Sequence, residues 1–386
     1  MDAIPLEIAD LASLIDRAPR PADPTRLDSV LSGKRVLITG AGGSIGSELA
    51  RIACAHNPSS LVLMDRSENA LFELDRELRT HHDSDAHRVL LQDVVDEVGT
   101  RRAFLRHRPD VIFHAAAHKH VPMMEDHPGQ AVTNNLFGTR SVLESSIESG
   151  VSRFVLVSTD KAVEPSSVMG ATKRLAELLV LTRQQHADIR TSVVRFGNVL
   201  GSSCSVLPIW MRQIREGGPL TLTDPRMTRY FMTIPEAAAL VIQSAGLSGG
   251  RADVFVLDMG EPISIMDLAT RLIERCGLEP VLLDEDASSL PNQMGIRVTG
   301  VRPGEKLHEE LSYIAESLLP TEIEGIRSWR SQPDDSWNVD AMLEDLDRAR
   351  GHESDHEVHK ALERWVTGYR CKSVISVSDR VLSRAG

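Results

Sequence analysis

A chain of 386 residues with 41% hydrophobic residues is too apolar for a disordered protein and is long enough for one large domain with an appendage or for two modest domains. Its formal net charge of −12 argues against general electrostatic binding of nucleic acid, although it allows a local basic pocket for a small anion. The four cysteines, Cys54, Cys204, Cys276 and Cys371, lie far apart and form no CxxC pair. We therefore expect reduced thiols and no metal site.

We expect no secretory signal at the start of this sequence, because no continuous apolar core follows a basic end there. No stretch approaches 18 uninterrupted apolar residues, so we expect no membrane span in this chain and a cytoplasmic location. Residues 1–31 are expected to form a leader. It consists of a short amphipathic helix in "LEIADLASLIDR" and a linker where the three prolines of "APRPADP" stop the helix.

From Lys34 onward, seven short apolar runs alternate with helical stretches. Continuously apolar strands are buried on both faces, which predicts a parallel sheet covered by helices on each side. Strands that alternate with helices predict right-handed crossovers and a doubly wound α/β sheet. The runs are "RVLITG", "SLVLMD", "RVLLQD", "VIFHAA", "RFVLVST", "TSVVRFG" and "VFVLDMG".

The segment "VLITGAGGSIGSELA" joins the first run to a helix through Gly40, Gly43 and Gly46. Missing side chains allow a tight turn, a close approach of a pyrophosphate and packing of the helix on the sheet. The backbone of Ser44 and Ile45 opens the helix, whose N-terminus favours phosphate. This pattern predicts a dinucleotide site.

Acidic residues end the second and third runs. Asp65 follows the glycines by about 20 residues, where a carboxylate accepts from ribose hydroxyls and repels a 2′-phosphate, which favours NAD over NADP. Arg66 beside it weakens that preference, since arginine suits a 2′-phosphate. Asp93 and Val94 are placed for the adenine, and the alternative for both acids is a helix-capping role.

The small residues Ala115 and Ala116 end the fourth run and let the backbone lie against a flat cofactor. Asn135, on the following helix, is expected to support the backbone. We assign residues 32–200 and about 233–260 to an NAD-binding domain. Regularity is lost over 201–232 and 261–335, which predicts a smaller discontinuous cap, and 336–386 is expected to be a helical extension with surface histidines.

The fifth run ends in "STDKAV", where the carboxyl edge of an open α/β sheet usually binds its ligand. Thr159 offers a hydroxyl, and Asp160 and Lys161 put an acid and a base on adjacent residues. An aspartic acid made neutral by burial can donate a proton, and a lysine made neutral by its neighbours can accept one. The alternative is an ordinary salt bridge at a strand end.

Several long motifs occur in one order: the glycine pattern, "HAAAHKHVPMME", "STDKAVEPSSVMGATKR", "RFGNVLGSS", "TDPRMTRYFMTIPEA" and "VRPGEKLHEEL". Over about Asp28 to Trp329 the chain resembles the UDP-N-acetylglucosamine 4,6-dehydratases, which are extended short-chain dehydrogenases/reductases with a Rossmann-like sheet. The resemblance implies that hydride leaves C4 of the sugar for bound NAD, water is eliminated across C5 and C6, and the hydride returns to C6. It also implies Asp160 as acid and Lys161 as base.

The resemblance also identifies a departure at position 169. Most such enzymes carry a tyrosine acid/base where this chain has Met169, and Lys173 follows one helical turn later, where the family's lysine bonds the nicotinamide ribose. The family has a branch with methionine at this position, and the resemblance to that branch implies that the configuration at C5 is retained. The O4 proton must then leave through Asp160, Lys173 or an ordered water.

For the substrate, a UDP-sugar, the resemblance points to a set of residues around the cap. Cys204 stands where the family usually has glycine, which puts the local turn in doubt. Uridine diphosphate requires backbone amides, arginines and a slot for uracil. The substrate candidates are Lys119, Asn198, Arg229, Arg302 and Glu305, and an interdomain ion pair is the alternative for the cap residues.

Three other interpretations stay open: a C5-inverting dehydratase, a nucleotide-sugar 4-epimerase, and a non-catalytic NAD-binding scaffold. An epimerase needs no acid/base pair for C5 and C6, so "TDK" argues against it. The resemblance further implies a homodimer or higher homo-oligomer paired through the helices after the fourth and fifth strands. The chain also resembles the soluble part of the family's long members, which carry an N-terminal membrane region and would lie at the cytoplasmic face of the inner membrane.

Overall fold

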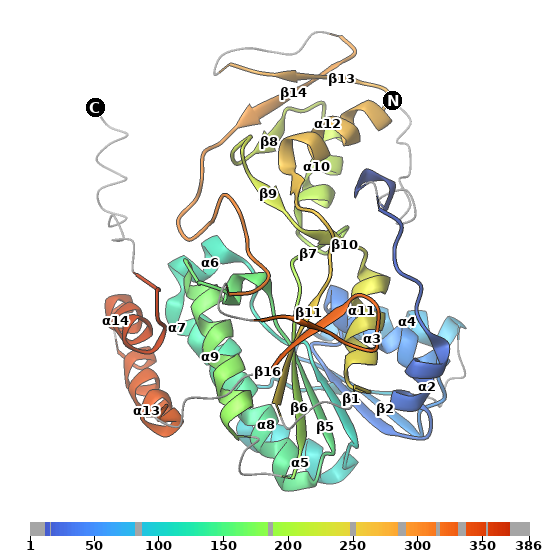
Figure 1. Ribbon diagram of the computed structural model, residues 1–386, viewed down its shortest axis with the longest axis vertical. Helices are drawn as coiled ribbons and strands as arrows, with labels where there is room; N and C mark the ends of the chain where they lie inside the picture. Colours follow the sequence, from blue (N-terminus) through green and yellow to red (C-terminus); the bar gives the residue numbers. More distant parts are fainter. Residues whose placement is uncertain are drawn as a thin grey trace.

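The computed structural model describes residues 12–15, 17–81, 87–183, 188–247, 252–284, 291–313, 317–330, 337–352 and 354–370. In Figure 1 the chain forms a lower body around a large sheet and a smaller upper body above it. Most of the expected amphipathic leader helix lies outside the described residues, and the described part contains a short 3-10 turn, η1 (Ser13–Ile15).

Each of the seven apolar runs forms a strand of one parallel sheet, as predicted. The strands are ordered β11-β6-β5-β4-β1-β2-β3, so the winding reverses between β1 and β4 and leaves a crevice at their carboxyl ends. Their bounds are β1 (Arg35–Thr39), β2 (Ser60–Asp65), β3 (His87–Leu91), β4 (Val111–His114), β5 (Arg153–Val157), β6 (Arg190–Arg195) and β11 (Ala252–Leu257).

Two further strands extend this sheet and correct one predicted boundary. β16 (Ile326–Arg330) pairs antiparallel with β11, and β15 (Leu319–Pro320) pairs with β16, which makes a sheet of nine strands. Both lie in the 261–335 range assigned to the cap. The sequence did not predict β15 and β16 because these strands are short and lack a long apolar run.

Helices cover both faces of the sheet, which gives the Rossmann-like three-layer fold (Figure 1). Alternate residues of each strand point to opposite faces, so Ile38 packs in one hydrophobic cluster and Leu37 in the other. One layer contains α2 (Pro24–Leu31), α3 (Ser44–Ala55), α4 (Glu68–His81) and α11 (Ile234–Ser244), and the other contains α5 (Glu97–His107), η2 (Val132–Phe137), α8 (Gly138–Ser149) and α9 (Val168–Arg183).

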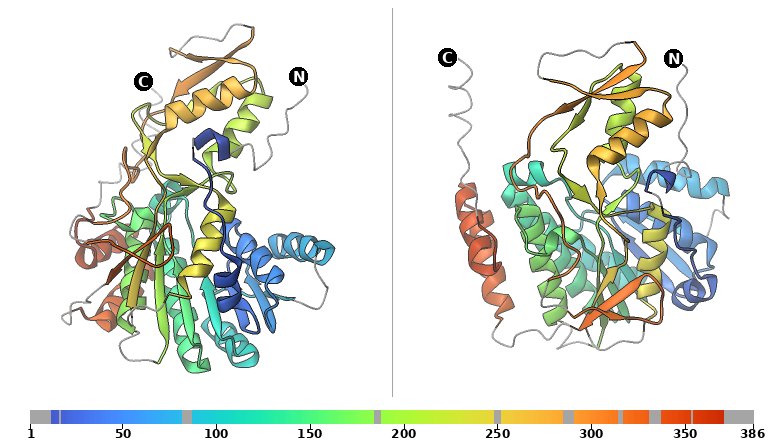
Figure 2. Two further views of the ribbon diagram at one scale, coloured as in Figure 1. Left: turned by 45° about the vertical axis from the view of Figure 1, so that its right-hand side comes forward. Right: turned by 45° about the horizontal axis from the view of Figure 1, so that its top comes forward.

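The upper body stands above the sheet in both views of Figure 2. It has a hydrophobic cluster of its own, in which Trp210 is fully buried. Two short strand pairs, β10 (Phe231–Met232) with β7 (Asn198–Val199) and β12 (Ile263–Ser264) with β9 (Thr228–Arg229), lie between it and the main sheet. Its other elements are α10 (Val206–Arg215), β8 (Leu220–Leu222), α12 (Ile265–Arg275), β13 (Glu279–Leu282) and β14 (Gln293–Val298).

The segment expected to be a linker before residue 31 is partly a helix of the lower body. Asp23 caps α2 by accepting from the backbone N–H groups of Thr25 and Arg26, and Pro24 occupies the first helical position. Leu27 and Leu31 are buried with α3 and α11 in the same cluster. The proline that was interpreted as a helix breaker therefore starts a helix.

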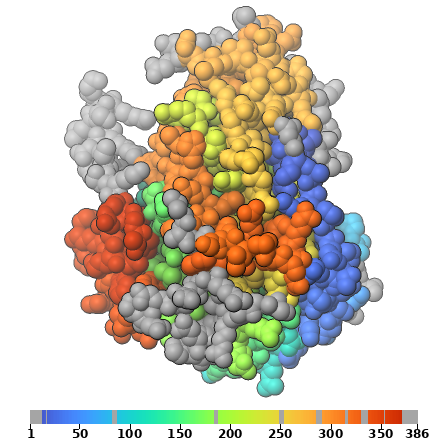
Figure 3. All heavy atoms as spheres, in the orientation of Figure 1, coloured from blue at the N-terminus to red at the C-terminus, as the bar shows by residue number. Residues whose placement is uncertain are grey.

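The C-terminal extension forms two packed helices, α13 (Val339–Arg350) and α14 (Asp355–Trp365), on the side of the lower body (Figure 3, red). The expectation of a solvated helix with surface histidines is wrong for His359, which is buried and lies 2.8 Å from the Tyr369 hydroxyl. α14 also packs against α9, so the chain itself covers part of a helix expected to pair between subunits. Among the described helices, none has the length and apolarity needed to cross a membrane.

If α2 belongs to the core, Leu31→Ala should lower the free energy of unfolding by about 2–5 kcal/mol, because it leaves a cavity beside α11. Thr25→Ala, at an exposed position of the same helix, should change it by less than about 0.5 kcal/mol. Urea unfolding of both variants checks this, and equal stabilities would show that α2 is a peripheral linker.

Candidate active site

The turn from β1 to α3 forms a cradle whose space exists because glycines occupy the turn. Gly40 has a left-handed φ of +68°, and a Cβ there would lie 2.6 Å from the backbone nitrogen of Ala116. A Cβ on Gly46 would lie 2.0 Å from the Gly40 carbonyl oxygen. Gly43 caps α3 without a side-chain hydrogen bond, so the first N–H groups of this 12-residue helix are available to an anion.

One end of this cradle opens into a hollow of about 140 Å³ where the predicted adenosine residues meet. Asp65 accepts from the backbone N–H groups of Gly42 and Ser67, both at 2.9 Å, and so holds the glycine turn. Arg66 lies 3.8 Å from Asp93, so a carboxylate faces its guanidinium. The hollow is lined by Gly40, Gly43, Asp65, Arg66, Gln92, Asp93, Val94, Ala115, Ala116, Ala117, His118 and Asn134.

Asn135 supports the backbone between these elements, as expected. Its Oδ1 accepts from the His118 N–H at 2.8 Å, and its Nδ2 donates to the His118 carbonyl and to Thr172. It therefore ties the loop after β4 to α9.

The other end of the cradle continues into a hollow of about 480 Å³ that contains Ser44, Ile45 and the predicted catalytic segment. Lys173 donates to the Val157 carbonyl at 2.7 Å, and burial lowers its pKa to about 8. Met169 is 3% exposed and presents a thioether beside Thr159 and Lys161 in the lining. A thioether can neither donate nor accept a proton in catalysis.

Thr159, Asp160 and Lys161 follow β5 in a 3-10 turn, η3 (Asp160–Ala162). The Thr159 hydroxyl donates to Oδ1 of Asp160 at 2.8 Å, and Nζ of Lys161 donates to the same oxygen at 2.9 Å. Asp160 is fully buried and does not line the 480 Å³ hollow, whereas Thr159 and Lys161 do. A ligand would therefore meet Asp160 through its two neighbours.

The neighbours of Lys161 do not make it neutral, contrary to expectation. Burial opposes its charge, but the carboxylates of Asp160 and Glu309 outweigh burial and raise the pKa of Lys161. In the resting site Lys161 is an ammonium ion paired with the carboxylate of Asp160. A role as base therefore requires a change in protonation during the reaction.

A buried ion pair fixes the strand end beneath this segment. Glu177 on α9 accepts from the Ser158 hydroxyl at 2.6 Å and from Arg195 at 2.7 and 2.8 Å. Burial alone would raise the pKa of Glu177, but Arg195 and the other donors lower it to about 2. The pair joins β5, β6 and α9 directly below Thr159.

All five predicted substrate residues line a third hollow of about 180 Å³ between the two bodies. It shares Lys119, His120, Lys161 and Asn198 with the 480 Å³ hollow, so the two adjoin at Lys161. The lining consists of Lys119, His120, Val121, Pro122, Lys161, Ser166, Ser167, Asn198, Arg229, Arg302, Gly304, Glu305, Lys306 and Glu309.

The contacts of the two cap arginines differ. Arg229 is buried and donates to the carbonyls of Thr228, Lys306 and Leu307 at 2.7–3.0 Å, so it chiefly holds the cap loop. Arg302 is exposed and pairs with Glu305 at 2.6 Å. Its guanidinium therefore faces the opening of the hollow.

Two acceptor atoms in this hollow lack donors, and one belongs to a residue that sequence reasoning missed. Oδ1 of Asn198 and Oε2 of Glu309 are buried without a hydrogen-bond partner among the described residues. Glu309 lies four residues after Glu305 in "EKLHEE". The sequence shows a second acidic residue in this cap motif. It does not distinguish Glu309, which is buried, from Glu310, which is exposed.

The doubt about the turn at Cys204 is justified. Cys204 has a left-handed φ of 57°, a conformation that glycine adopts without strain. The neighbouring Ser203 N–H donates to the Ser44 hydroxyl at 3.0 Å, and Lys119 donates to the Ser203 carbonyl at 2.8 Å. The strained turn thus closes over the start of α3.

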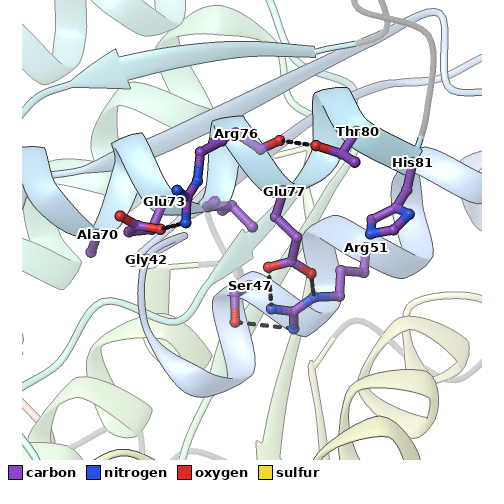
Figure 4. Close-up of a pocket in the computed structure, with 10 residues that line it drawn as sticks. Gly42, Ser47, Arg51, Ala70, Glu73, Arg76, Glu77, Thr80 and His81 are labelled. Atoms are coloured by element: carbon purple, nitrogen blue, oxygen red, sulfur yellow. Dashed lines mark hydrogen bonds and ion pairs between the residues drawn. The ribbon is translucent and has the colours of Figure 1, made fainter.

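A larger hollow of about 600 Å³ lies between α3 and α4, away from this segment (Figure 4). Its arginines are paired: Arg51 with Glu77 and Glu48, and Arg76 with Glu73. It contains none of the predicted catalytic residues, and the site described above remains the candidate.

Comparisons with known proteins agree with this architecture. The family model described as "Polysaccharide biosynthesis protein" matches residues 36–330. The chain belongs to this polysaccharide biosynthesis protein family. Its relatives include nucleotide-sugar 4,6-dehydratases and 4-epimerases.

Two curated relatives and one solved structure illustrate the similarity. The chain is 46% identical over 301 residues to the probable polysaccharide biosynthesis protein EpsC of Bacillus subtilis, which is 77% of this chain and 48% of that protein. It is 31% identical over 301 residues to an inverting UDP-N-acetylglucosamine 4,6-dehydratase of Campylobacter jejuni, covering 76% of this chain and 82% of that protein. The X-ray structure of Pen from Bacillus thuringiensis superposes with a TM-score of 0.70 and 32% identity, covering 80% of this chain and 90% of that one. The chain spans about half the length of EpsC.

Cys204→Gly should raise the free energy of unfolding by about 0.5–1 kcal/mol, because the relief of left-handed strain exceeds the entropy cost of glycine. Cys276→Gly is the control: its φ is not left-handed, so the same substitution there should destabilise. Thermal and urea unfolding check both. A loss of stability in Cys204→Gly would show that the turn depends on the cysteine side chain.

Proposed function

We propose that this protein catalyses the NAD-dependent dehydration of UDP-N-acetylglucosamine to UDP-2-acetamido-2,6-dideoxy-4-keto-hexose, with the C5 configuration retained. The observation that carries the proposal is the Asp160–Lys161 pair at the border of two hollows, since Lys161 lines both. One hollow begins at the glycine turn and suits a dinucleotide, and the other lies under the cap and suits a sugar nucleotide.

NAD fits the cradle because glycine at positions 40 and 46 leaves the space that a Cβ would fill. Among the described residues no side chain caps the N-terminus of α3, whose N–H groups suit the pyrophosphate. Asp65 at the ribose position and Asp93 opposite Arg66 favour NAD over NADP, since a 2′-phosphate would meet negative charge. Lys173 and the alanines after β4 would hold the nicotinamide, which would supply the acceptor for a hydride from C4 of the sugar and the donor of that hydride to C6.

Thr159 and Asp160 replace the absent tyrosine in handling the O4 proton. Thr159 lines the hollow and donates to Asp160, so it can accept the O4 proton while passing its own to the carboxylate. Asp160 then holds the acid proton that is released, through the same hydroxyl, to the departing O6. Met169 fills the tyrosine's place without taking part in proton transfer.

Lys161 removes the C5 proton and returns it to the same face, which retains the configuration at C5. The unpartnered Oδ1 of Asn198 suits a hydroxyl group of a pyranose. Arg302 and Lys119 supply positive charge for the diphosphate at the opening, and Glu305 holds Arg302 in place.

We further propose that the chain is the catalytic part of a longer protein that works at the cytoplasmic face of the inner membrane in surface polysaccharide biosynthesis. A homodimer would have to accommodate α14, which covers part of α9.

Purified protein incubated with UDP-N-acetylglucosamine and NAD should form a 4-keto-6-deoxy product, observed by its absorbance in alkali and by NMR. Asp160→Asn and Lys161→Met should each lower kcat by about 10²–10⁴-fold, because each removes a general acid or base.

The matched control is Asp110→Asn, which removes a carboxylate paired with Arg35 at 2.6 Å at the opposite edge of the sheet. It should leave kcat unchanged. Formation of the C4 epimer without a ketone would support the 4-epimerase interpretation, and full turnover by both site variants would reject the assigned roles.

A further inference from the structure

A second carboxylate faces Lys161, from the loop that follows β14. Glu309 is 7% exposed, and its Oε1 lies 3.7 Å from Nζ of Lys161 and 3.8 Å from Arg229. Its Oε2 is buried and, in the part of the chain that the structure describes, has no hydrogen-bond partner. A buried carboxylate oxygen without a donor is costly unless a ligand or a proton meets it.

Lys161 therefore lies between two carboxylates that come from different bodies. Asp160 is the nearer at 2.9 Å and Glu309 is 3.7 Å away. Arg229 forms an ion pair with Glu309 at 3.8 Å and also donates to the carbonyls of the cap loop, and Lys306 donates to the Val163 carbonyl at 3.0 Å. The four charges of Asp160, Lys161, Glu309 and Arg229 sum to zero.

The proposed reaction needs Lys161 as a neutral amine when C5 is deprotonated, although it rests as an ammonium ion. Once Asp160 has received the O4 proton, Lys161 loses its nearest counter-charge. The ammonium proton then needs an acceptor inside a site from which the sugar has displaced water. Glu309 is the second carboxylate beside Lys161, and its Oε1, at 3.7 Å, has to approach Nζ by about 0.5 Å to form the hydrogen bond through which the proton moves.

We propose that Glu309 is a positioning residue that accepts the ammonium proton of Lys161 before the C5 step and returns it afterwards; this rests on the proposed function. An N–H bond of Lys161 breaks and an O–H bond of Glu309 forms, which converts an ion pair into an amine and a carboxylic acid without changing the net charge. In a site closed to water, a neutral pair avoids the cost of two buried charges.

The protons balance over the cycle. Asp160 receives the O4 proton and gives it to O6, which leaves as water. Lys161 receives the C5 proton and returns it to C5 when the hydride reaches C6. Glu309 then returns its proton to Lys161, and all three groups are again in their resting states.

The test follows C5–H exchange of the 4-keto product in D₂O, catalysed by the holoenzyme in the Asp160→Asn background. The neutral amide stands for protonated Asp160. Exchange should be independent of pH around neutrality while Glu309 is present. With Glu309→Gln added it should be about 10²-fold slower at neutral pH and should rise with pH, since solvent must then remove the Lys161 proton.

Glu310→Gln is the matched control, because Glu310 is the adjacent acid and is exposed; it should leave the rate and the pH profile unchanged. Glu309→Asp keeps a carboxylate and should restore exchange that is independent of pH. A loss of rate that high pH does not restore in Glu309→Gln would indicate a structural role and overturn the proposal.

A second measurement of the coupling between Glu309 and Lys161 does not depend on catalysis. In an NMR titration of lysine Nζ in the substrate-free protein, Glu309→Gln should lower the pH at which Lys161 titrates, and Glu310→Gln should not. An unchanged Lys161 titration in Glu309→Gln overturns the proposal.

If the wild-type protein dehydrates UDP-N-acetylglucosamine and Glu309→Gln does so equally fast at every pH, only the role of Glu309 fails. If the wild-type protein makes no 4-keto product, the proposed function fails and this inference fails with it.

Discussion

The contact on which the site depends is the 2.9 Å ion pair between the fully buried carboxylate of Asp160 and the ammonium of Lys161. A carboxylate that is removed from water needs donors, and here Thr159 and Lys161 both donate to Oδ1 from adjacent positions, whereas the buried Oδ2 has no hydrogen-bond partner among the described residues. The segment can hold this geometry because Glu177 and Arg195 fix the end of β5 from below. Gly197 leaves the carboxylate its space, since a Cβ there would lie 3.0 Å from Oδ2 of Asp160.

The fold brings the two halves of the site to this pair. The reversal of strand order between β1 and β4 opens a crevice beside β5, and the glycine turn makes one side of that crevice a dinucleotide cradle. The cap covers the other side and contributes Arg229 and Glu309. Lys161 is thus reached from both bodies, and its charge depends on carboxylates from each.

Much of this could be predicted from the sequence, and the failures have physical reasons. Apolar runs predicted the seven parallel strands because a parallel strand inside a sheet must be apolar on both faces, but the expected burial on both faces is wrong for β3, an edge strand that leaves Val89 and Leu91 exposed. Pro24 was misread because proline both breaks and starts helices, and only the packing of Leu31 decides between them. The burial of His359 and the charge of Lys161 depend on groups distant in sequence. Glu309 was missed for the same reason, since only the folded chain separates it from Glu310.

The fate of the C4 hydrogen is the most direct test of the proposed dehydration. UDP-N-acetylglucosamine that carries deuterium at C4 should give a 4-keto-6-deoxy product whose C6 methyl group contains that deuterium, as read by NMR and mass spectrometry. Deuterium that remains at C4 of an epimer, or a product without a C6 methyl group, would contradict it.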